Sequence, residues 1–311
     1  MEERRLQVFR TVARELSFSR AGLALHLSQS AVSQQIAALE QEVGGPLFDR
    51  SRRRIRLTPA GAALLNRVDA LLGDFAEARR AVAAARGAVE GDLRVAASRT
   101  VGTYLLPRPL AALGRRNPTV RLQVSIENSE QVVRTVLSGQ ADVGYVEDAV
   151  QNSAILLTPL LEDELLVVAP AAHRFAEVPA VAPEDLAAEP WIVRERGSGT
   201  RRASEEHLLA AGVPVAELNV VAELSGIEVI KAAVEAGLGI SILSSASLTK
   251  ERALGTLVAR PLAGVRIRRS ISAVAPIGGT ELPAARQLTS LLATVDMGGG
   301  AGHPAGRAPS L

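Results

Sequence analysis

The chain has 311 residues, 47% hydrophobic and 22% charged, which is enough apolar material for about two to three domains and too apolar for a disordered chain. It contains no cysteine, which excludes disulfides, thiol catalysis and thiolate metal sites and favours a reducing compartment. No apolar run approaches the ~20 residues that span a bilayer, and the first residues do not follow the pattern of a secretory signal. These features predict a cytoplasmic protein that makes no membrane contact.

The net charge of +2 is unevenly distributed along the chain. Residues 1–91 carry 14 arginines and 10 acidic residues, whereas residues 92–311 carry 21 basic and 23 acidic residues. A basic amino-terminal part and a slightly acidic body indicate two parts with different tasks. The total charge alone is weak evidence for nucleic-acid binding, because arginine-rich usage also follows from a GC-rich genome.

The amino-terminal segment predicts three short helices. The apolar faces of the first two contain Leu6, Phe9, Val12 and Ala13, and then Ala21, Leu23, Ala24 and Leu27. Ser17 and Ser19 are alternative N-caps for the second helix. A third helix buries Ala31, Val32, Ile36 and Leu39 and leaves outward the uncharged polar residues Gln29, Ser30, Ser33, Gln34 and Gln35.

Two short helices joined by a tight turn are typical of a helix-turn-helix, in which the second helix reads DNA. Gln can bond base edges and Ser can bond phosphate or bases, which would suit the outward face of the third helix. The alternative is a helical hairpin with an ordinary polar face, and the spacing alone leaves both open.

A basic stretch follows, in which Arg50, Arg52, Arg53, Arg54 and Arg56 surround Ile55 and precede Leu57. The pattern predicts a small β-hairpin with a basic tip, a wing that would hold the DNA backbone. A charged run is usually a solvated surface, but arginines gathered without an acidic residue are costly without a partner.

Residues Leu6 to Gly61 resemble the winged helix-turn-helix of LysR-type transcriptional regulators. The matching residues are Phe9, Ser17-Phe18-Ser19, Ala21, Leu27, Ser28 to Ser33, Ile36, Leu39-Glu40, Gly44, Leu47-Phe48, Arg50 and Leu57 to Gly61. Gly22 and Ser30 depart from the family's usual Ala and Pro, and we expect Gly22 to weaken its helix by up to ~1 kcal/mol. The resemblance implies a DNA-binding domain at residues 1–58 that contacts DNA through Ser17, Ser19, Ser28, Gln29, Ser30, Ser33, Gln34, Arg50, Arg52, Arg53 and Arg54.

Thr58 and Pro59 predict the start of a long helix. Its apolar residues repeat with alternating spacings of four and three, as Leu64, Val68, Leu71, Phe75, Ala78, Val82, Ala85 and Val89. Such a seam fits a two-helix coiled coil better than the alternative, a helix packed on its own domain. The resemblance implies that residues 59–90 are a linker helix that dimerises through Leu64, Val68, Leu71, Phe75 and Val82, with dimers pairing into a homotetramer.

From residue 91 onward, strand and helix patterns alternate, which predicts parallel sheets with helices on both faces. The expected strands are 93–97, 122–126, 143–146, 165–168, 191–193, 220–224, 240–243 and 271–274; the expected helices are 105–113, 132–137, 202–211, 227–234 and 284–292. The resemblance implies an α/β effector domain like a periplasmic binding protein. Its subdomains would comprise residues 91–163 with 267–295, and residues 164–266. The Gly- and Pro-rich residues 296–311 are expected to be a disordered tail.

Two strand ends are candidate ligand sites, because ligands of open α/β sheets bind at the carboxyl ends of strands and at helix N-termini. They contain Ser98, Arg99 and Thr100, and then Arg194, Glu195, Gly197, Ser198, Gly199 and Thr200. Glu147 and Ile227 follow two further strand candidates. The alternative is that these Ser and Thr residues only cap helices and that Glu147 faces water.

The strings 103–107 and 194–201 resemble the LysR branch that regulates sulfur assimilation and Calvin-cycle genes. That resemblance implies a small anionic effector, such as a sulfur oxyanion, an acetylserine-like compound or a phosphorylated sugar, and no cofactor. The predicted function is therefore a regulator whose promoter binding responds to a metabolite held between the two subdomains. Its partners would be double-stranded promoter DNA, a second copy of the chain, the effector and RNA polymerase.

Two other function classes compete with this one. A periplasmic-type small-molecule binding protein without DNA function is opposed by the missing export signal and the basic first 91 residues. An enzyme is opposed by four scattered histidines, at positions 26, 173, 207 and 303, and by the absence of a G-x-S-x-G elbow or a P-loop. We therefore expect no catalytic residue and no metal site.

Overall fold

The computed structural model describes residues 1–50, 55–86, 89, 91–147 and 152–297. The amino-terminal domain consists of α1 (Glu3–Glu15), α2 (Phe18–Leu25), α3 (Gln29–Val43) and the two-stranded hairpin β1 (Phe48–Asp49) and β2 (Arg56–Leu57). Phe9, Ile36, Leu39 and Phe48 lie in its core. The predicted winged helix-turn-helix is confirmed, except that Leu23 and Ala24 on α2 are exposed rather than buried.

The turn between α2 and α3 depends on Gly22. The amide of Leu27 donates to the Gly22 carbonyl at 2.8 Å, and His26 adopts the left-handed conformation that ends α2. A Cβ on Gly22 would meet the Leu27 carbonyl oxygen at 2.7 Å, which is too close. Gly22 therefore permits the close approach that the turn requires, and the expected weakening of the helix is offset at this position.

Helix α4 (Pro59–Arg86) is the long helix predicted after the wing, and it begins where Thr58 Oγ1 accepts from the Gly61 amide at 3.0 Å. Its apolar residues do not form one uniform seam. Val68 is fully buried in the core of the amino-terminal domain, which corrects its assignment to a dimer interface. Leu64 and Leu71 pack partly against the same core. Phe75 and Val82 are 38% and 63% exposed, so the surface open to a partner lies on the second half of the helix.

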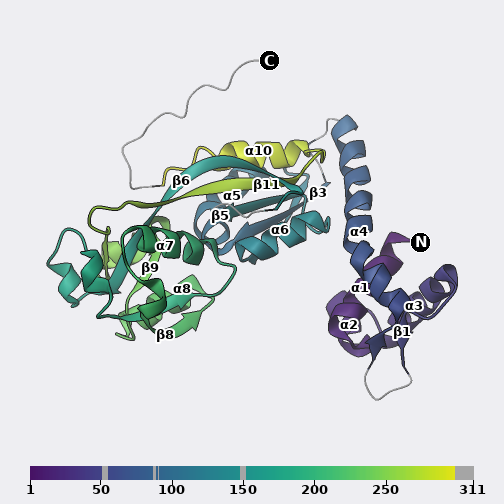
Figure 1. The fold of residues 1–311 in the computed structure, drawn as a ribbon. Helices are drawn as coiled ribbons and strands as arrows, with labels where there is room; N and C mark the ends of the chain where they lie inside the picture. Colours follow the sequence, from purple (N-terminus) through teal and green to yellow (C-terminus); the bar gives the residue numbers. More distant parts are fainter. Residues whose placement is uncertain (51–54, 87–88, 90, 148–151, 298–311) are drawn as a thin grey trace.

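The rest of the chain forms an α/β body beside α4 (Figure 1). Its strands are β3 (Gly91–Ser98), β4 (Val120–Glu127), β5 (Val143–Glu147), β6 (Ile155–Pro170), β7 (Pro190–Arg194), β8 (Asn219–Leu224), β9 (Ser241–Ser244), β10 (Leu257–Arg260) and β11 (Ile267–Pro276). Its α-helices are α5 (Pro107–Arg116), α6 (Ser129–Leu137), α7 (Gly199–Ala210), α8 (Ile227–Glu235), α9 (Thr249–Leu254) and α10 (Pro283–Leu292), and a π-helical turn covers Val101–Leu105. Every predicted strand and helix of this body corresponds to an observed one, whereas α9, β10 and the first half of β6 were not predicted.

The main sheet is mixed, and this corrects the expectation of parallel sheets. Its strand order is β10-β6-β11-β5-β3-β4, with β9 also paired to β6. β3 runs parallel to β4 and β5, and β7 runs parallel to β8, but β6 and β11 are antiparallel to each other and to their other neighbours.

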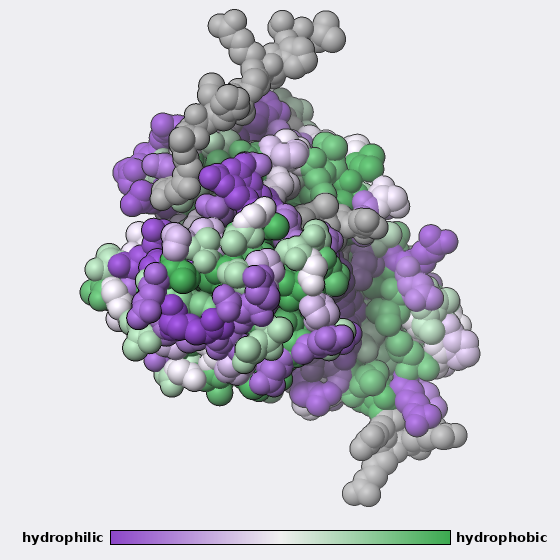
Figure 2. All heavy atoms as spheres, turned by 60° about the vertical axis from the view of Figure 1, so that its left-hand side comes forward, coloured by the Kyte–Doolittle hydropathy of each residue, from purple (hydrophilic) through white to green (hydrophobic). Residues whose placement is uncertain are grey.

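The long strands β6 and β11 connect two halves of the body (Figure 1). The first half is built on β3, β4 and β5, between α6 on one face and α5 with α10 on the other. The second half is built on β7 to β10 with α7 and α8. Hydrophilic and hydrophobic residues intermix on the face that Figure 2 turns forward. The carboxyl ends of β3, β5 and β7 meet where the two halves join.

Candidate functional site

Helix α3 presents the polar face predicted for DNA reading. Gln29, Ser30 and Gln34 are exposed, and Gln29 Nε2 donates to Ser33 Oγ at 3.1 Å. Ser28 is also exposed but caps the helix, since its Oγ accepts from the Ala31 amide at 3.1 Å. Capping therefore occupies part of the hydrogen-bonding capacity of Ser28, while the glutamine amides remain at the surface.

The two serines at the start of α2, Ser17 and Ser19, have different environments. Ser17 is the N-cap and accepts from the Arg20 amide at 3.2 Å, so its hydroxyl serves the helix. Ser19 lies two residues further along and is exposed. Of the two, Ser19 is therefore the side chain more accessible to a ligand.

The wing is joined to α3 by Glu40, to which the sequence pattern assigned no role. Glu40 Oε1 accepts from the amides of Leu47 and Phe48 at 2.8 and 3.2 Å. Its Oε2 accepts from Arg50 Nη2 at 3.1 Å, and the Arg50 guanidinium lies 4.8 Å from the Phe18 ring centroid. Arg50 thus helps to orient the wing on α2 and α3. Arg52, Arg53 and Arg54 lie outside the described residues.

The second candidate site is the junction of the two halves of the body, where Arg269 of β11 is buried. Arg269 Nη1 donates to Thr200 Oγ1 at 2.8 Å, and Nη2 donates to Thr100 Oγ1 at 3.2 Å. Thr100 follows β3 and Thr200 begins α7, so one guanidinium connects the two strand ends that the sequence singled out. The alternative of capping is wrong for both threonines, because Thr100 makes no side-chain capping bond, Ser198 is the N-cap of α7, and both threonine hydroxyls accept from Arg269.

Two buried carboxylates complete this network. Arg269 forms ion pairs with Asp163 at 2.6 Å and with Glu147 at 3.1 Å. Asp163 Oδ1 also accepts from Ser244 Oγ at 2.7 Å. Glu147 Oε1 accepts from the Thr100 amide at 3.0 Å, so Glu147 points inward instead of facing water. Asp163, Ser244 and Arg269 were not among the predicted site residues, because only the pairing of β6 with β11 and β9 brings them together.

Burial and neighbouring charges shift the pKa values of Glu147 and Asp163 in opposite directions. Burial disfavours the charged form of Glu147, but the Arg269 and Arg194 guanidinium groups and the Thr100 amide outweigh it and hold the pKa of Glu147 below its ordinary value. Burial dominates at Asp163 and raises its pKa in spite of Arg269. Glu147 is therefore the more firmly ionised of the two.

Glu195 bridges the two halves near the edge of the network. Its carboxylate accepts from Arg194 Nε and Nη2 at 2.9 and 3.1 Å, and from Arg99 Nε at 3.3 Å. Arg99 follows β3 in the first half, whereas Arg194 ends β7 in the second. Arg194 Nη1 also donates to Thr200 Oγ1 at 3.2 Å. Two arginines from opposite halves thus hold one carboxylate that is still partly exposed.

Most of the other residues predicted for the effector site are buried. A Cβ on Gly199 would meet the Glu147 carbonyl oxygen at 2.3 Å, so only glycine lets the start of α7 approach β5 this closely. Ser198 caps α7 through the Arg201 amide, and Ser98 is fully buried at the end of β3. Gly197 lies in the loop before α7 with a positive φ of 82°. Ile227 is buried in the apolar core of the second half, so its side chain serves packing.

Comparison with known proteins identifies both parts of the chain. Residues 4–62 match the family described as bacterial regulatory helix-turn-helix protein, lysR family, and residues 86–296 match the LysR substrate binding domain. The chain belongs to the LysR family. It is a DNA-binding transcriptional regulator with an effector-binding domain, and the alternative of a binding protein without DNA function is therefore wrong.

Among its relatives, the protein is similar to the uncharacterized HTH-type transcriptional regulator YeiE of Escherichia coli K12. The two are 40% identical over 83% of this chain and 86% of the relative. It is also 33% identical to a probable RuBisCO transcriptional regulator of Trichormus variabilis, over 86% of this chain and 80% of the relative. The second relative confirms the predicted likeness to regulators of Calvin-cycle genes.

Solved LysR structures resemble both the whole chain and its effector domain. A full-length variant of OxyR from Pseudomonas aeruginosa has a TM-score of 0.70 at 25% identity and covers 96% of each chain. The regulatory domain of Synechocystis CcmR in complex with 2-PG has a TM-score of 0.60 at 27% identity, over 66% of this chain and 96% of that one.

Two further classes of site are absent from the described residues. Among them, none of the helices combines the length and apolar character needed to cross a bilayer. In the same part of the chain, His, Asp and Glu residues do not gather in groups of three or more that could hold a metal ion.

Proposed function

We propose that this LysR-family regulator binds a small anion at the junction of its two effector-domain halves, and that the anion controls promoter binding. The observation that carries the proposal is the Glu195 carboxylate, which Arg99 and Arg194 hold from opposite halves. An effector carboxylate, phosphate or sulfur oxyanion would replace Glu195 between these guanidinium groups.

Displacement of Glu195 is favoured over binding deeper in the network. Arg269 already donates to Asp163, Thr100 and Thr200 and pairs with Glu147, and all of these groups are buried. Glu195 lies in the loop between β7 and α7, and its side chain is 16% exposed, so it can move aside at lower cost. The likeness to CcmR, whose regulatory domain was solved with 2-PG, supports a small ligand in this domain.

Anion binding would then change how the two halves meet, because Arg99 and Arg194 belong to different halves. A shift between the halves would alter the arrangement of paired DNA-binding domains, which dimerise through the exposed part of α4 and assemble further into tetramers. Gln29, Ser30, Ser33 and Gln34 would contact bases or phosphates, and the wing arginines would contact the backbone. The protein would act on promoters in the cytoplasm, with RNA polymerase as a further partner and no catalytic role.

A thermal-shift titration with sulfate, phosphate and 2-phosphoglycolate tests the anion site. An anion at ~100 times its Kd should add about 2.7 kcal/mol to stability. Glu195→Gln should bind the same anion several-fold more tightly, since it removes the internal competitor, and Arg99→Gln should bind it more weakly. Glu184→Gln, a change at an exposed position in Pro183–Leu186, should bind like the wild type. Equal affinities of the wild type and both junction variants would contradict the proposal.

A further inference from the structure

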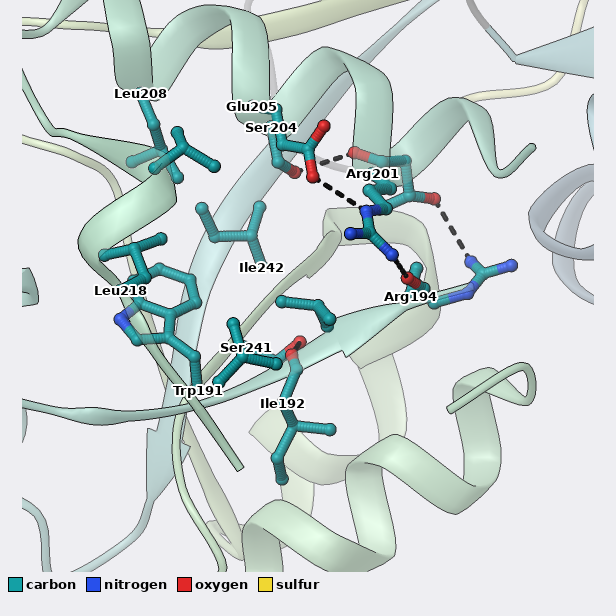
Figure 3. A pocket seen from close by; sticks show the side chains of 14 residues that line it. Trp191, Ile192, Arg194, Arg201, Ser204, Glu205, Leu208, Leu218, Ser241 and Ile242 are labelled. Atoms are coloured by element: carbon teal, nitrogen blue, oxygen red, sulfur yellow. Dashed lines mark hydrogen bonds and ion pairs between the residues drawn. The ribbon is translucent and has the colours of Figure 1, made fainter. Parts of the chain in front are cut away.

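A cavity with a volume of about 80 Å³ lies beneath α7 in the second half of the effector domain (Figure 3). One end is apolar and is formed by Trp191, Leu208, Leu218 and Ile242. Arg201 and Glu205 of α7 lie toward the other end (Figure 3). All of the residues that line the cavity belong to the second half, so the cavity lies on one side of the junction and shares only its edge, Arg194 and Thr200, with the junction network.

The polar groups around this cavity are already partnered. Ser241 Oγ donates to the Ile192 carbonyl at 2.7 Å, and Ser204 Oγ donates to the Thr200 carbonyl at 2.7 Å. The Trp191 indole donates to the Leu186 carbonyl at 2.9 Å.

The charge at the polar end is balanced as well. Arg201 pairs with Glu205 and with Glu223, each at 2.7 Å. A charged ligand would have to break these ion pairs, whereas a neutral apolar molecule would only have to fill the space.

We propose that this cavity is a second ligand site, which takes a small neutral apolar molecule with a branched alkyl chain or a single ring. Closed apolar cavities of about 150 Å³ hold benzene or xenon. This cavity has about half that volume but is partly open, so a single ring or a branched alkyl chain would enter it in part and leave the rest at the opening. Trp191, Leu208 and Leu218 supply the contact surface, and the Arg201–Glu205 pair borders the site.

A ligand in the cavity would affect the junction of the two halves by moving the first turn of α7. Arg194 and Thr200 line the cavity and also belong to the Arg269 network, where Thr200 Oγ1 accepts from both arginines. Arg201 Nη1 donates to the Arg194 carbonyl at 3.0 Å and ties the cavity edge to β7. A ligand that shifts α7 would therefore shift Thr200, and the two sites would affect each other reciprocally.

Fluorescence offers a direct test, because Trp191 is the sole tryptophan of the chain. We expect cyclohexanol, which does not absorb near 295 nm, to change the emission of the full-length protein along a saturating curve. Ser204→Leu and Val215→Phe fill the cavity from α7 and from the Val215–Glu217 turn, and should remove the saturating change. Ser290→Leu loses an equivalent hydroxyl-to-carbonyl bond on α10 and should behave like the wild type.

Far-UV circular dichroism shows which variants are folded. Two cavity-filling variants, Ser204→Leu and Val215→Phe, are compared so that the test still stands if one of them does not fold. A tryptophan emission that changes linearly with cyclohexanol and does not saturate in the wild type would contradict the proposed site. A folded cavity-filling variant that keeps the saturating change of the wild type would also contradict it. Hydrogen exchange of residues 195–202 measures the coupling without any anion. At saturating cyclohexanol, a change of at least twofold in the exchange rate of residues 195–202 supports the coupling between the cavity and the junction. An unchanged rate contradicts this coupling.

Discussion

Arg269 and Asp163 face each other in the register of β11 and β6, and their side chains form a 2.6 Å ion pair that is fully buried. The pair lies where the two halves of the effector domain join. Removing one partner would leave the other charge buried without its counter-ion, which costs about 3–5 kcal/mol. The same guanidinium also accounts for the hydrogen bonds to Thr100 and Thr200, so it stabilises the whole junction.

We therefore predict that Arg269→Ala lowers the urea midpoint of the effector-domain transition by an amount equivalent to about 3–5 kcal/mol. Arg268→Ala is the matched control on the same strand, since Arg268 is exposed and pairs with the exposed Glu162. Loss of such a surface pair should cost no more than about 1 kcal/mol. Equal midpoints for the two variants would show that the buried network does not stabilise the domain.

The lowered pKa of Glu147 predicts a specific acid response. Its ionised form contributes stability above its ordinary value of 4.5, and that contribution is lost as the pH falls through the lower pKa of the folded protein. Arg194→Gln removes one of the two guanidinium groups that hold this pKa down. The pKa of Glu147 should then rise, and acid unfolding should begin at a higher pH than in the wild type.

Circular dichroism between about pH 6 and pH 2 follows this transition. Arg196→Gln changes the exposed arginine two residues along and should unfold at the pH of the wild type. An acid transition of Arg194→Gln that coincides with the control would mean that Arg194 does not set the ionisation of Glu147.

Local patterns were sufficient to predict most of the fold, because a helix or strand face is set by neighbouring residues. The heptad spacing identified α4, and the apolar face formed by Val32, Ile36 and Leu39 identified α3. The partner of an apolar residue is not a local property, which explains why Val68 was assigned to a dimer seam although it fills the core of its own domain.

The junction shows the same limit for polar residues. Thr100 and Thr200 could be recognised because each follows a strand end. Arg269 and Asp163 could not, since their positions are 106 residues apart in the sequence and only the β6–β11 register makes them neighbours. Once the pairing of β6 with β11 is known, the ion pair of Arg269 with Asp163 can be predicted.

The exposed glutamines of α3 predict base-specific binding. Gln34→Ala should weaken binding to a specific promoter site by about 1–3 kcal/mol and leave binding to random duplex unchanged. Gln41→Ala, at an exposed position near the end of the same helix, is the control. Fluorescence anisotropy with both duplexes measures the difference. An equal loss on both would indicate backbone contact by Gln34.

The arginines of the wing should contribute to DNA binding independently of the base sequence. Arg53→Ala should weaken binding to all duplexes and reduce the slope of log affinity against log salt by about 1, as expected when one phosphate contact is lost. Random-duplex affinity and salt slope both equal to those of the wild type would exclude a role of Arg53 in holding the backbone.

The second half of α4 should carry self-association, because Phe75 and Val82 are exposed while Val68 is not. Val82→Glu would place a charge in the centre of a coiled-coil seam and should shift the protein from dimers or larger species to the 32.6 kDa monomer in sedimentation velocity. Ala70→Glu introduces the same side chain at an exposed position outside the seam and should leave the assembly unchanged. Because dimers align two DNA-binding domains with two half-sites, Val82→Glu should also lose affinity for a two-half-site promoter while keeping its affinity for a single half-site. A Val82→Glu variant that sediments like the wild type would place the dimer interface elsewhere on the chain.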